Sequence, residues 1–598
     1  MSKIEVRKRT RHGVALILVL ILVVMISLGA YTFTDMMIAE ERATVMSGRQ
    51  MQAQAGVASG VEYLKDYLAY APEDQIAIGG HWDNPSYFKD IPVSGDDPTG
   101  LRFAIVSVAQ DQTGEPTGWR YGLEDEGSKI NINVLATSDL YEPEEEEFEE
   151  GEGSDGEGEG GEGGGEQGGG GDQGGGGGGD QGGGPGGDQG GGGDQPNPAE
   201  LQAVGGRGDD ELATEAFDDP RLNVLMQLPL MTEQIADSII DFIDEDDDPR
   251  PAGAEGDVYA GSTNYSPPNS RIGSLDELLL VDGVTTELLY GADRNHNGLI
   301  DEDEQAFVQP AGAEGSMARG WSAYLTVHSK DYLQQSEDPE PIDVNGDDLE
   351  ALYDELIAAG IETDISNYII AYRQGGAYEP PEPQEPQEGE EPQEPEEPPV
   401  AESISGRTPT FEGGDGEIGS VLDIIGSSTQ TTFDGEDEEV LVASPLSEDS
   451  DLSGILPTLM STLSVGETTG EGRINLNHCS SAAMSGLPCL DFTVAQNILL
   501  SQDPSQASGD LNYLYPTWTL ARGAVSIDQM KALLPYVSGT GTVYRAQVIG
   551  YSDVPGVYAR AEVVIDASGD APTVLSWRDL THLGPGFDPE TFTTGGTP

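Results

Sequence analysis

The sequence predicts an α+β protein with a long N-terminal helix, helical-hairpin repeats, a C-terminal β meander and two disordered acidic inserts. Three observations predict this class. An apolar run opens the chain, Asn-rich strand-like openings recur before paired apolar helices, and residues 544–580 alternate apolar and polar side chains around turn residues. The chain has 598 residues, with 27 Lys and Arg against 109 Asp and Glu, a formal net charge of −82. This balance argues against nucleic-acid binding, which needs clustered cations.

The N-terminus predicts a membrane anchor. Residues 1–13 contain five Lys and Arg residues, and Val14–Thr34 is a run of 21 uncharged residues. A helix of that length spans a hydrocarbon core of about 30 Å, and the positive flank places the N-terminus in the cytoplasm. Residues 35–70 contain no proline and keep apolar side chains at helical spacing, so we expect the helix to continue into a soluble domain. A secretory signal peptide is the alternative, although the apolar run is long for one.

The basic leader, the glycine at its end and the continuing helix resemble a type IV prepilin. The resemblance implies that prepilin peptidase cleaves between Gly13 and Val14 and methylates the new amine of Val14. Pilins and major pseudopilins carry a glutamate at the fifth mature position, which is Leu18 here. That buried glutamate is tolerable only when paired, and a terminal subunit lacks one neighbour. Leu18 therefore favours a protein at the filament tip, with a simple signal anchor as the alternative.

Two low-complexity segments are predicted to be disordered. Residues 142–198 carry 17 acidic residues and 28 glycines but no Lys or Arg, and residues 379–399 carry 9 acidic residues between spaced prolines. Neither segment has enough apolar surface to offset the entropy of ordering. The prolines of the second segment favour a stiff polyproline II spacer.

The soluble region contains repeats of an Asn-rich opening followed by a helical hairpin. The clearest copy is residues 473–502, another is split between 128–140 and 221–244, and a looser copy is 341–373. Shorter hairpins at 274–289 and 520–537 have the same pattern. These units resemble helix-hairpin-helix motifs, which bind DNA phosphates through a Gly-x-Gly turn. The turns here lack that sequence and lie in acidic surroundings, which favours a packing role.

The repeats, together with the stretch IIDFIDEDDDPRPAGAEGDVY at 239–259 and NSRIGSLDELLLVDGVTTELLYG at 269–291, resemble the type II secretion system protein K family. The resemblance implies a minor pseudopilin at the tip of the pseudopilus, with the other minor pseudopilins and the major pseudopilin as partners. It also implies a single-pass protein of the inner membrane with a periplasmic head and a cytoplasmic leader. The chain departs from typical members in its length, its acidic inserts and its third repeat.

One stretch predicts a metal site. Residues 293–304 read DRNHNGLIDEDE and match the calcium-loop pattern D-x-[DN]-x-[DN]-G-x5-E. Calcium takes six to eight oxygen ligands, and Gly298 allows the sharp turn that such a loop needs. The expected ligands are Asp293, Asn295, Asn297, Leu299 through its carbonyl, Asp301 and Glu304. Calcium binding is also a property that the family resemblance implies.

A second acidic cluster is a weaker calcium candidate, with a solvated helix end as the alternative. It comprises Asp244, Asp246, Asp247, Asp248 and Glu255. Calcium is the one cofactor that the sequence predicts. Asp343, Asn345 and Asp347 begin like another calcium loop but lack its closing glutamate, so we interpret them as a repeat opening.

The sequence predicts no enzyme, because it contains no HExxH, GxSxG or phosphate-loop motif. Cys479 and Cys489 are the only cysteines. A straight helix between them would hold them about 12 to 15 Å apart, too far for a disulfide, whereas a bent segment would allow one. A disulfide and two buried free thiols therefore both remain open.

The functional prediction is a minor pseudopilin that takes part in protein secretion, with a calcium-dependent adhesin and a DNA-uptake protein as alternatives. The expected organisation is a leader (1–13), a transmembrane and pilin helix (14–70), head strands (71–141), a Glu/Gly-rich insert (142–200), a repeat domain with the calcium loop (201–378), a Pro/Glu-rich linker (379–400), a second hairpin region (401–543) and a β meander with a tail (544–598).

Overall fold

A single long helix, α1 (His12–Leu68), opens the protein. The run of apolar side chains near its start is exposed, and α1 is the one helix in the described residues that is long and apolar enough to cross a membrane. The helix continues without a break, as its lack of proline predicts, and contacts the rest of the protein from about Gln50 onwards. The Gln50 side chain donates to the carbonyl of Tyr558 at 2.8 Å. The expected membrane helix and the expected soluble helix are therefore one element.

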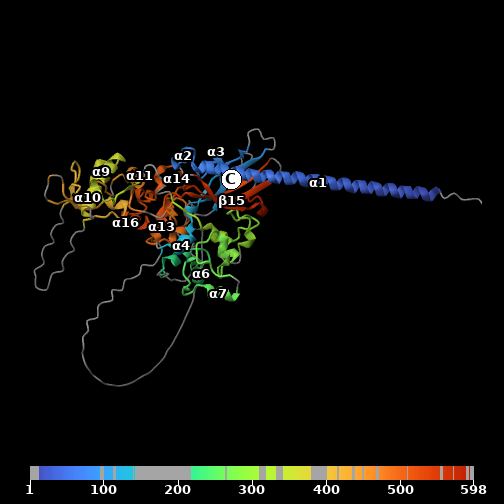
Figure 1. Ribbon diagram of the computed structural model, residues 1–598, viewed down its shortest axis with the longest axis horizontal. Helices are drawn as coiled ribbons and strands as arrows, with labels where there is room; N and C mark the ends of the chain where they lie inside the picture. Colours follow the sequence, from blue (N-terminus) through green and yellow to red (C-terminus); the bar gives the residue numbers. More distant parts are fainter. Residues whose placement is uncertain are drawn as a thin grey trace, which may run out of the picture. The chain divides into compact units, whose positions relative to one another are not determined.

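The C-terminal part of α1 lies against an antiparallel sheet (Figure 1). The order of the main strands is β1-β2-β14-β15-β16, with β3 paired to β2 and β4 paired to β14. The strands are β1 (Ile91–Pro92), β2 (Arg102–Gln110), β3 (Pro116–Arg120), β4 (Glu124–Asp125), β14 (Val543–Tyr551), β15 (Tyr558–Asp566) and β16 (Thr573–Asp579). The head strands and the C-terminal strands, which the sequence suggests as separate regions, thus form one sheet in which Val548 pairs with Ile105.

A glycine in β14 allows α1 to approach this sheet closely. Ala53, Val57 and Val61 recur at the spacing of one helix face and are buried. A side chain on Gly550 of β14 would collide with the backbone of Ala53 and Val57. Apolar residues earlier in the same pattern, such as Met46, are exposed. The helical spacing therefore extends beyond the part of α1 that the sheet covers.

Three blocks of repeated design are inserted between β4 and β14. Each block begins and ends with a short strand, and the two strands pair in parallel. Block 1 (130–327) is closed by β5 (Ile130–Asn131) and β6 (Leu325–Thr326), block 2 (342–464) by β7 (Ile342–Asp343) and β11 (Leu463–Ser464), and block 3 (474–538) by β12 (Ile474–Asn475) and β13 (Val537–Ser538).

One asparagine in the opening of each block fastens a distant segment of that block. The Oδ1 atom of Asn133 accepts from the Ile272 amide at 2.8 Å, and its Nδ2 donates to the Ile272 carbonyl at 3.0 Å. Asn345 makes the same pair of bonds with Ile418, at 3.0 and 2.9 Å. Asn477 is the corresponding residue of block 3. The Asn-rich openings are therefore structural clamps that satisfy backbone groups inside each block.

The remaining elements are mostly short helices within the blocks. Block 1 contains α4 (Ile132–Thr137), α5 (Pro220–Leu225), α6 (Glu233–Ile243), α7 (Gly256–Ser262), η4 (Leu275–Leu280), α8 (Thr286–Tyr290), η5 (Gln305–Phe307) and η7 (Trp321–Ala323). Block 2 contains α9 (Leu349–Ala358), α10 (Thr363–Gly375), η8 (Val421–Ile424), α11 (Leu452–Thr462) and a small sheet of β8 (Glu402–Ser403), β10 (Val440–Ala443) and β9 (Ser428–Thr431). Block 3 contains α12 (Ser481–Ser485), α13 (Phe492–Ser501), α14 (Pro504–Ala507), η9 (Leu511–Leu514), α15 (Trp518–Ala521) and α16 (Ile527–Leu533). Outside the blocks lie α2 (Pro72–Ala77), α3 (Pro85–Phe88), η1 (Glu126–Ser128) and η10 (Thr581–Leu583).

The combination of the long apolar helix, the sheet and the helical blocks confirms the α+β class. The computed structural model describes residues 12–93, 100–111, 116–138, 141, 217, 219–262, 265–308, 318–331, 341–378, 400–413, 416–433, 435, 438–447, 450–466, 470–507, 509–552, 556–569, 571–587 and 592. The Glu/Gly-rich insert and residues 379–399 of the linker lie outside the described residues. So does the leader up to residue 11, whereas Gly13 and Val14 lie in the backbone of α1.

Candidate calcium sites in block 1

Three aspartates lie in or at the end of the helix α6, just before the acidic stretch of block 1. The Thr232 side chain caps its N-terminus by accepting from the Ile235 amide, and its apolar side chains are buried. Asp237 and Asp241 are buried within the helix, and Asp244 is the residue that ends it. Because isolated buried carboxylates are costly, each of these three side chains needs a partner.

Asp237 and Asp241 find their partners in the PRPAGAE segment that follows. Arg250 donates from Nε to Asp237 at 2.8 Å and from Nη2 to Asp219 at 2.6 Å. The Asp241 carboxylate accepts from the Arg250 amide, and a side chain on Gly253 would collide with that carboxylate. The segment is therefore folded back against α6 by charge-assisted bonds and by one glycine that must stay small.

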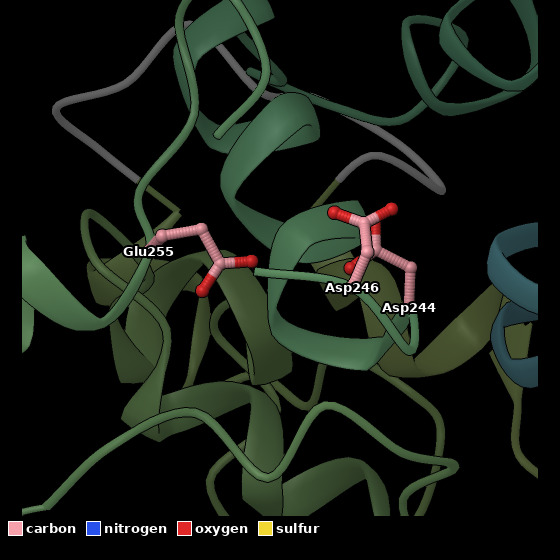
Figure 2. A group of neighbouring side chains, drawn as sticks. All are labelled: Asp244, Asp246 and Glu255. Carbon is pink, nitrogen blue, oxygen red and sulfur yellow. The ribbon is translucent and has the colours of Figure 1, made fainter. Parts of the chain in front are cut away.

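Asp244 is brought together with Asp246 and Glu255. In the described part of the chain, these are the three carboxylates that each place an oxygen within 4.8 Å of the others. Figure 2 shows Glu255 extending toward the two aspartates from a separate stretch of chain. One oxygen of Asp244 and one of Glu255 are buried without a hydrogen-bond partner. Burial and the charges of Asp246 and Asp241 raise the pKa of Asp244 to about 7.

The other two residues of this predicted cluster do not join it. Asp247 and Asp248 are exposed. The Asp247 side chain accepts from the Asn269 amide nitrogen at 3.0 Å, and the Asp248 backbone amide donates to Asp246 at 2.8 Å. The backbone bond holds Asp246 in the orientation that faces Asp244. The acidic run therefore divides into three converging carboxylates and a solvated remainder.

The predicted loop 293–304 is organised by its own acids. Asp293 accepts from the amides of Asn297 and Gly298, and Glu304 accepts from those of Arg294 and Asp301. Gly298 has a φ of 79°, as the sharp turn requires. The side chains of Asn295 and Asn297 each donate to one oxygen of Asp301, at 2.6 and 3.0 Å. Leu299 donates its amide to the Asn297 side chain at 2.8 Å. All six residues that the sequence predicts as ligands thus lie in one hydrogen-bonded loop.

The loop is also fastened to the sheet. Gln547 of β14 donates to the His296 carbonyl at 2.6 Å, and Arg560 of β15 donates to the Asn295 carbonyl. Asn297 donates to the Gly586 carbonyl at 2.6 Å. Burial, together with the charge of Glu304, raises the pKa of Asp293 to about 7. The loop is therefore a largely buried acidic turn through which block 1 contacts the sheet.

One comparison with known families concerns the central part of block 1. Residues 201–292 match the family described as type II secretion system (T2SS), protein K. This segment is similar to protein K of type II secretion systems. The match spans α5 to α8 and contains the cluster of Asp244, Asp246 and Glu255, while the loop 293–304 begins directly after it. No curated protein and no solved structure gives a significant match to the chain.

The apolar helix is consistent with the similarity to protein K. The family works in type II secretion, and one apolar N-terminal helix fits a single-pass membrane anchor in such a component. The two cysteines do not form a disulfide. Cys479 is buried and Cys489 is exposed, so the idea of two buried thiols is wrong for Cys489. Cys489 sits at the turn between α12 and α13, where the chain has a φ of 62°.

Sequence reasoning missed two groups of polar residues. Asp125 and Glu126 are buried side by side between the sheet and the blocks. His81 and His478 approach each other from distant parts of the chain, with ring centroids 6.0 Å apart. No local pattern marks these residues, because their partners lie about 200 residues or more away in the sequence. Only the position of His478 directly after a repeat opening could have drawn attention to it.

Proposed function

We propose that this protein is a minor pseudopilin at the tip of a type II secretion pseudopilus, where it takes part in protein secretion without catalysis. The observation that carries the proposal is the protein K segment on a chain whose apolar helix runs unbroken into the head. The proposed position is the inner membrane, with the head in the periplasm. The proposed partners are the other minor pseudopilins and the major pseudopilin.

The shape of α1 supports this role in physical terms. Its apolar side chains up to Phe33 are exposed and can pack against lipid or against other pilin helices. From Ala53 onwards the same helix is buried against the sheet, so a displacement of the helix would move the head with it. Leu18 replaces the glutamate that repeated shaft subunits carry, and three blocks on one head would crowd a repeated shaft. Both features favour the tip.

Leader processing gives the first test. We expect prepilin peptidase to cleave between Gly13 and Val14, so wild-type protein co-expressed with the peptidase migrates faster than Gly13→Ala. Mass spectrometry of the wild-type N-terminus should show a methylated Val14. A matched control is Gly29→Ala, because nothing lies within 4 Å of a side chain at Gly29 in the same helix. Equal mobility of wild type and Gly13→Ala would count against the prepilin assignment.

Partner binding gives the second test. Full-length protein purified in detergent should retain the other minor pseudopilins when they are co-expressed. Replacing the exposed residues Leu16 and Val23 by Asn should release these partners while the head stays folded, because both residues lie on the part of α1 outside the sheet. Retention of all partners by the double variant would contradict a shared helical bundle.

We further propose that block 1 binds calcium, and the donor chemistry supports this. Asp244, Asp246 and Glu255 supply only oxygens, two of which are buried without a partner. Hard cations such as calcium prefer such ligands, and a bound cation would favour the ionised form of Asp244. In the loop, Asp293, Asn295, Asn297, Leu299, Asp301 and Glu304 would hold a second ion, which would displace the present amide donors from Asp301. Calcium would supply charge neutralisation and cross-linking at both places.

Calcium titration of the full-length protein tests both sites. We expect calcium to raise the melting temperature, and expect Asp244→Asn and Glu304→Gln each to remove part of that rise. Asp247→Asn is the control for the cluster, because it changes the same acidic run at an exposed position outside the converging carboxylates. Glu302→Gln is the exposed control for the loop. A calcium response that is unchanged in both test variants would overturn the calcium proposal.

A further inference from the structure

The opening of block 3 lacks one hydrogen bond that the other blocks have. In blocks 1 and 2, the Oδ1 atom of the clamp asparagine accepts from a backbone amide. Asn477 still donates to the carbonyls of Tyr513 and Gly539, but its Oδ1 is buried without a partner. The Tyr513 amide is engaged in η9, where it donates to the Asp510 carbonyl at 3.1 Å. The donor that the clamp needs is therefore used elsewhere.

Other unpaired polar atoms gather at the same place. His81, Asn477, His478 and Tyr513 all line one cavity of about 20 Å³ between the segment after α2 and block 3. Each of them has a buried atom without a hydrogen-bond partner, namely Nε2 of His81, Oδ1 of Asn477, Nδ1 of His478 and the hydroxyl oxygen of Tyr513. Buried polar atoms are paired in most native structures. Four neighbouring residues that each have an unpaired buried atom therefore indicate an occupant beside this cavity.

The geometry favours a small metal ion as that occupant. Water can reach essentially none of the surface of these four atoms, and a water oxygen would need to lie about 2.8 to 3.0 Å from each nitrogen. A zinc–nitrogen bond is only about 2.0 to 2.1 Å long, so zinc fits a tighter space. Two imidazoles that share one zinc ion have centroids within about 6.5 Å of each other, and those of His81 and His478 are 6.0 Å apart.

We propose that His81 and His478 bind a borderline transition-metal ion such as zinc, with the Oδ1 atom of Asn477 as a third ligand. The cavity of about 20 Å³ beside them has room for one water molecule as the fourth ligand. The ion joins the loop after α2 to the opening of block 3, two segments that are almost 400 residues apart in the sequence. It thereby acts as a cross-link between the head and the last block.

The surroundings set the strength of this site. Trp82 stacks on the His478 ring with centroids 4.5 Å apart, and the Arg120 guanidinium lies 3.5 Å from the Trp82 ring centroid. Burial and the positive charge of Arg120 together lower the pKa of His81 to about 4, so the imidazole is neutral and able to donate its lone pair. The positive charge of Arg120 also opposes a bound cation. We therefore expect weaker binding than at a closed site of four charged ligands.

Cobalt and zinc binding to the full-length protein test the proposal. The protein is purified in detergent, stripped with EDTA and returned to excess calcium, so that the acidic sites of block 1 are filled. We expect one equivalent of Co²⁺ to give visible absorption bands of a four-coordinate ion, and Zn²⁺ to displace it. His81→Phe and His478→Phe keep an aromatic ring and remove the ligand nitrogens. Each should weaken binding by about 100-fold or more, whereas His582→Phe, elsewhere on the sheet side, should bind like wild type.

Thermal unfolding gives a second readout. Zinc should raise the melting temperature of the wild type and of His582→Phe but not of the two test variants, whose folding is checked by circular dichroism. If His478→Phe does not fold, His81→Phe decides, because His81 lies in a half-buried loop. Cobalt or zinc binding that is unchanged in the test variants overturns the proposal. Absence of any binding, with a water molecule in the cavity of an experimental structure, overturns it as well.

Discussion

Blocks 1 and 3 share a frame but differ in what the frame carries. Both begin with a clamp asparagine, close with a parallel strand pair, and turn between two helices through a residue with positive φ, Leu230 at 57° and Cys489 at 62°. Counted from that turn residue, Asp241 of block 1 corresponds to Leu500 of block 3. Asp241 is buried under the segment that folds back over α6, whereas Leu500 is 69% exposed. Among the residues that the structure describes, none covers Leu500 on this face of α13 in the same way.

The segment that follows the second helix also differs in how it surrounds an aspartate in the two blocks. By that count, Asp244 of block 1 corresponds to Asp503 of block 3. Asp503 accepts from the Ser505 hydroxyl at 2.8 Å and the Gln506 amide at 3.0 Å, and these bonds lower its pKa. Asp244 faces other carboxylates instead, and its pKa is raised. The repeat therefore specifies a backbone frame, while the segment that follows the second helix decides whether a carboxylate is free to bind a cation.

Blocks 1 and 3 are also attached to the sheet through two adjacent acidic residues, Glu126 and Asp125, whose partners differ chemically. Glu126 binds Arg545 and Lys129 and accepts from Thr326 at the closing strand of block 1. Asp125 accepts from the Asn475 side chain in block 3 at 2.7 Å and has no cation partner among its bonds. One attachment is a buried ion network and the other a buried carboxylate held by N–H donors. Substitutions of Glu126 and of Asp125 can therefore test the attachment of block 1 and that of block 3 separately.

The largest expected effect is at the attachment of block 1. Glu126→Gln leaves the positive charges of Arg545 and Lys129 without their buried counter-charge. We expect a loss of about 3 to 5 kcal/mol in the free energy of unfolding at pH 7. Urea unfolding monitored by hydrogen exchange in the closing strand of block 1 measures this loss. Arg271→Gln is the control, because it removes the surface ion pair with Glu471 and should cost about 1 kcal/mol or less.

The pH dependence should distinguish the two neighbours. Burial alone would raise the pKa of Glu126, but Arg545 and Lys129 lower it well below its ordinary value of 4.5. Its stabilisation is therefore full above about pH 4.5 and is lost as the pH falls further. The difference in unfolding free energy between wild type and Glu126→Gln should shrink in that range. A difference that stays constant down to the acid limit would contradict the ion network.

The contribution of Asp125 to stability depends on pH in the opposite direction. Burial raises its pKa from 3.8 to about 6, against the lowering effect of Asn475, Gly127 and Gly541. The folded state thus takes up a proton before the unfolded state does, and the cost of ionising Asp125 disappears as the pH falls from about 6 towards 3.8. Between pH 7 and 5, the attachment of block 3 should gain stability while that of block 1 stays unchanged. Hydrogen exchange in β12 and β6, corrected for intrinsic rates, measures this difference.

The clamp asparagines give the next largest effect. Asn133→Ala removes three bonds and leaves buried groups of Ile272 and Val327 unsatisfied, so we expect a loss of about 3 kcal/mol or more. Asn477→Ala removes two bonds and one acceptor that is already unpaired, and should cost about 2 kcal/mol in metal-free protein. Chemical unfolding of the two single variants compares them. Equal losses would show that the missing bond of block 3 has no energetic consequence.

The sequence predicted the parts of this structure that depend on local patterns. The proline-free helix α1 and the α+β class follow from apolar spacing, and the repeat openings follow from their asparagines. The sheet was harder, because β2 and β14 pair across more than 400 residues of chain. For calcium, the spacing of acidic residues along the sequence favoured the loop 293–304 over the acidic cluster at 244–255. In the structure three carboxylates converge at Asp244, Asp246 and Glu255. The acids of the loop accept hydrogen bonds from its own backbone amides, and calcium binding by the loop stays a prediction.

The turn residues of the two blocks give the smallest expected effect and the most direct check on their equivalence. Leu230 and Cys489 both adopt positive φ, which costs a residue with a Cβ atom about 1 kcal/mol relative to one that tolerates this region. Asparagine tolerates it, and both positions are exposed. Leu230→Asn and Cys489→Asn should therefore each stabilise the protein by about 0.5 to 1 kcal/mol in urea unfolding. Ser501→Asn, at the helical end of α13, should bring no gain. Stabilisation at one turn but not at the other would show that the two hairpins share a sequence pattern without sharing a backbone.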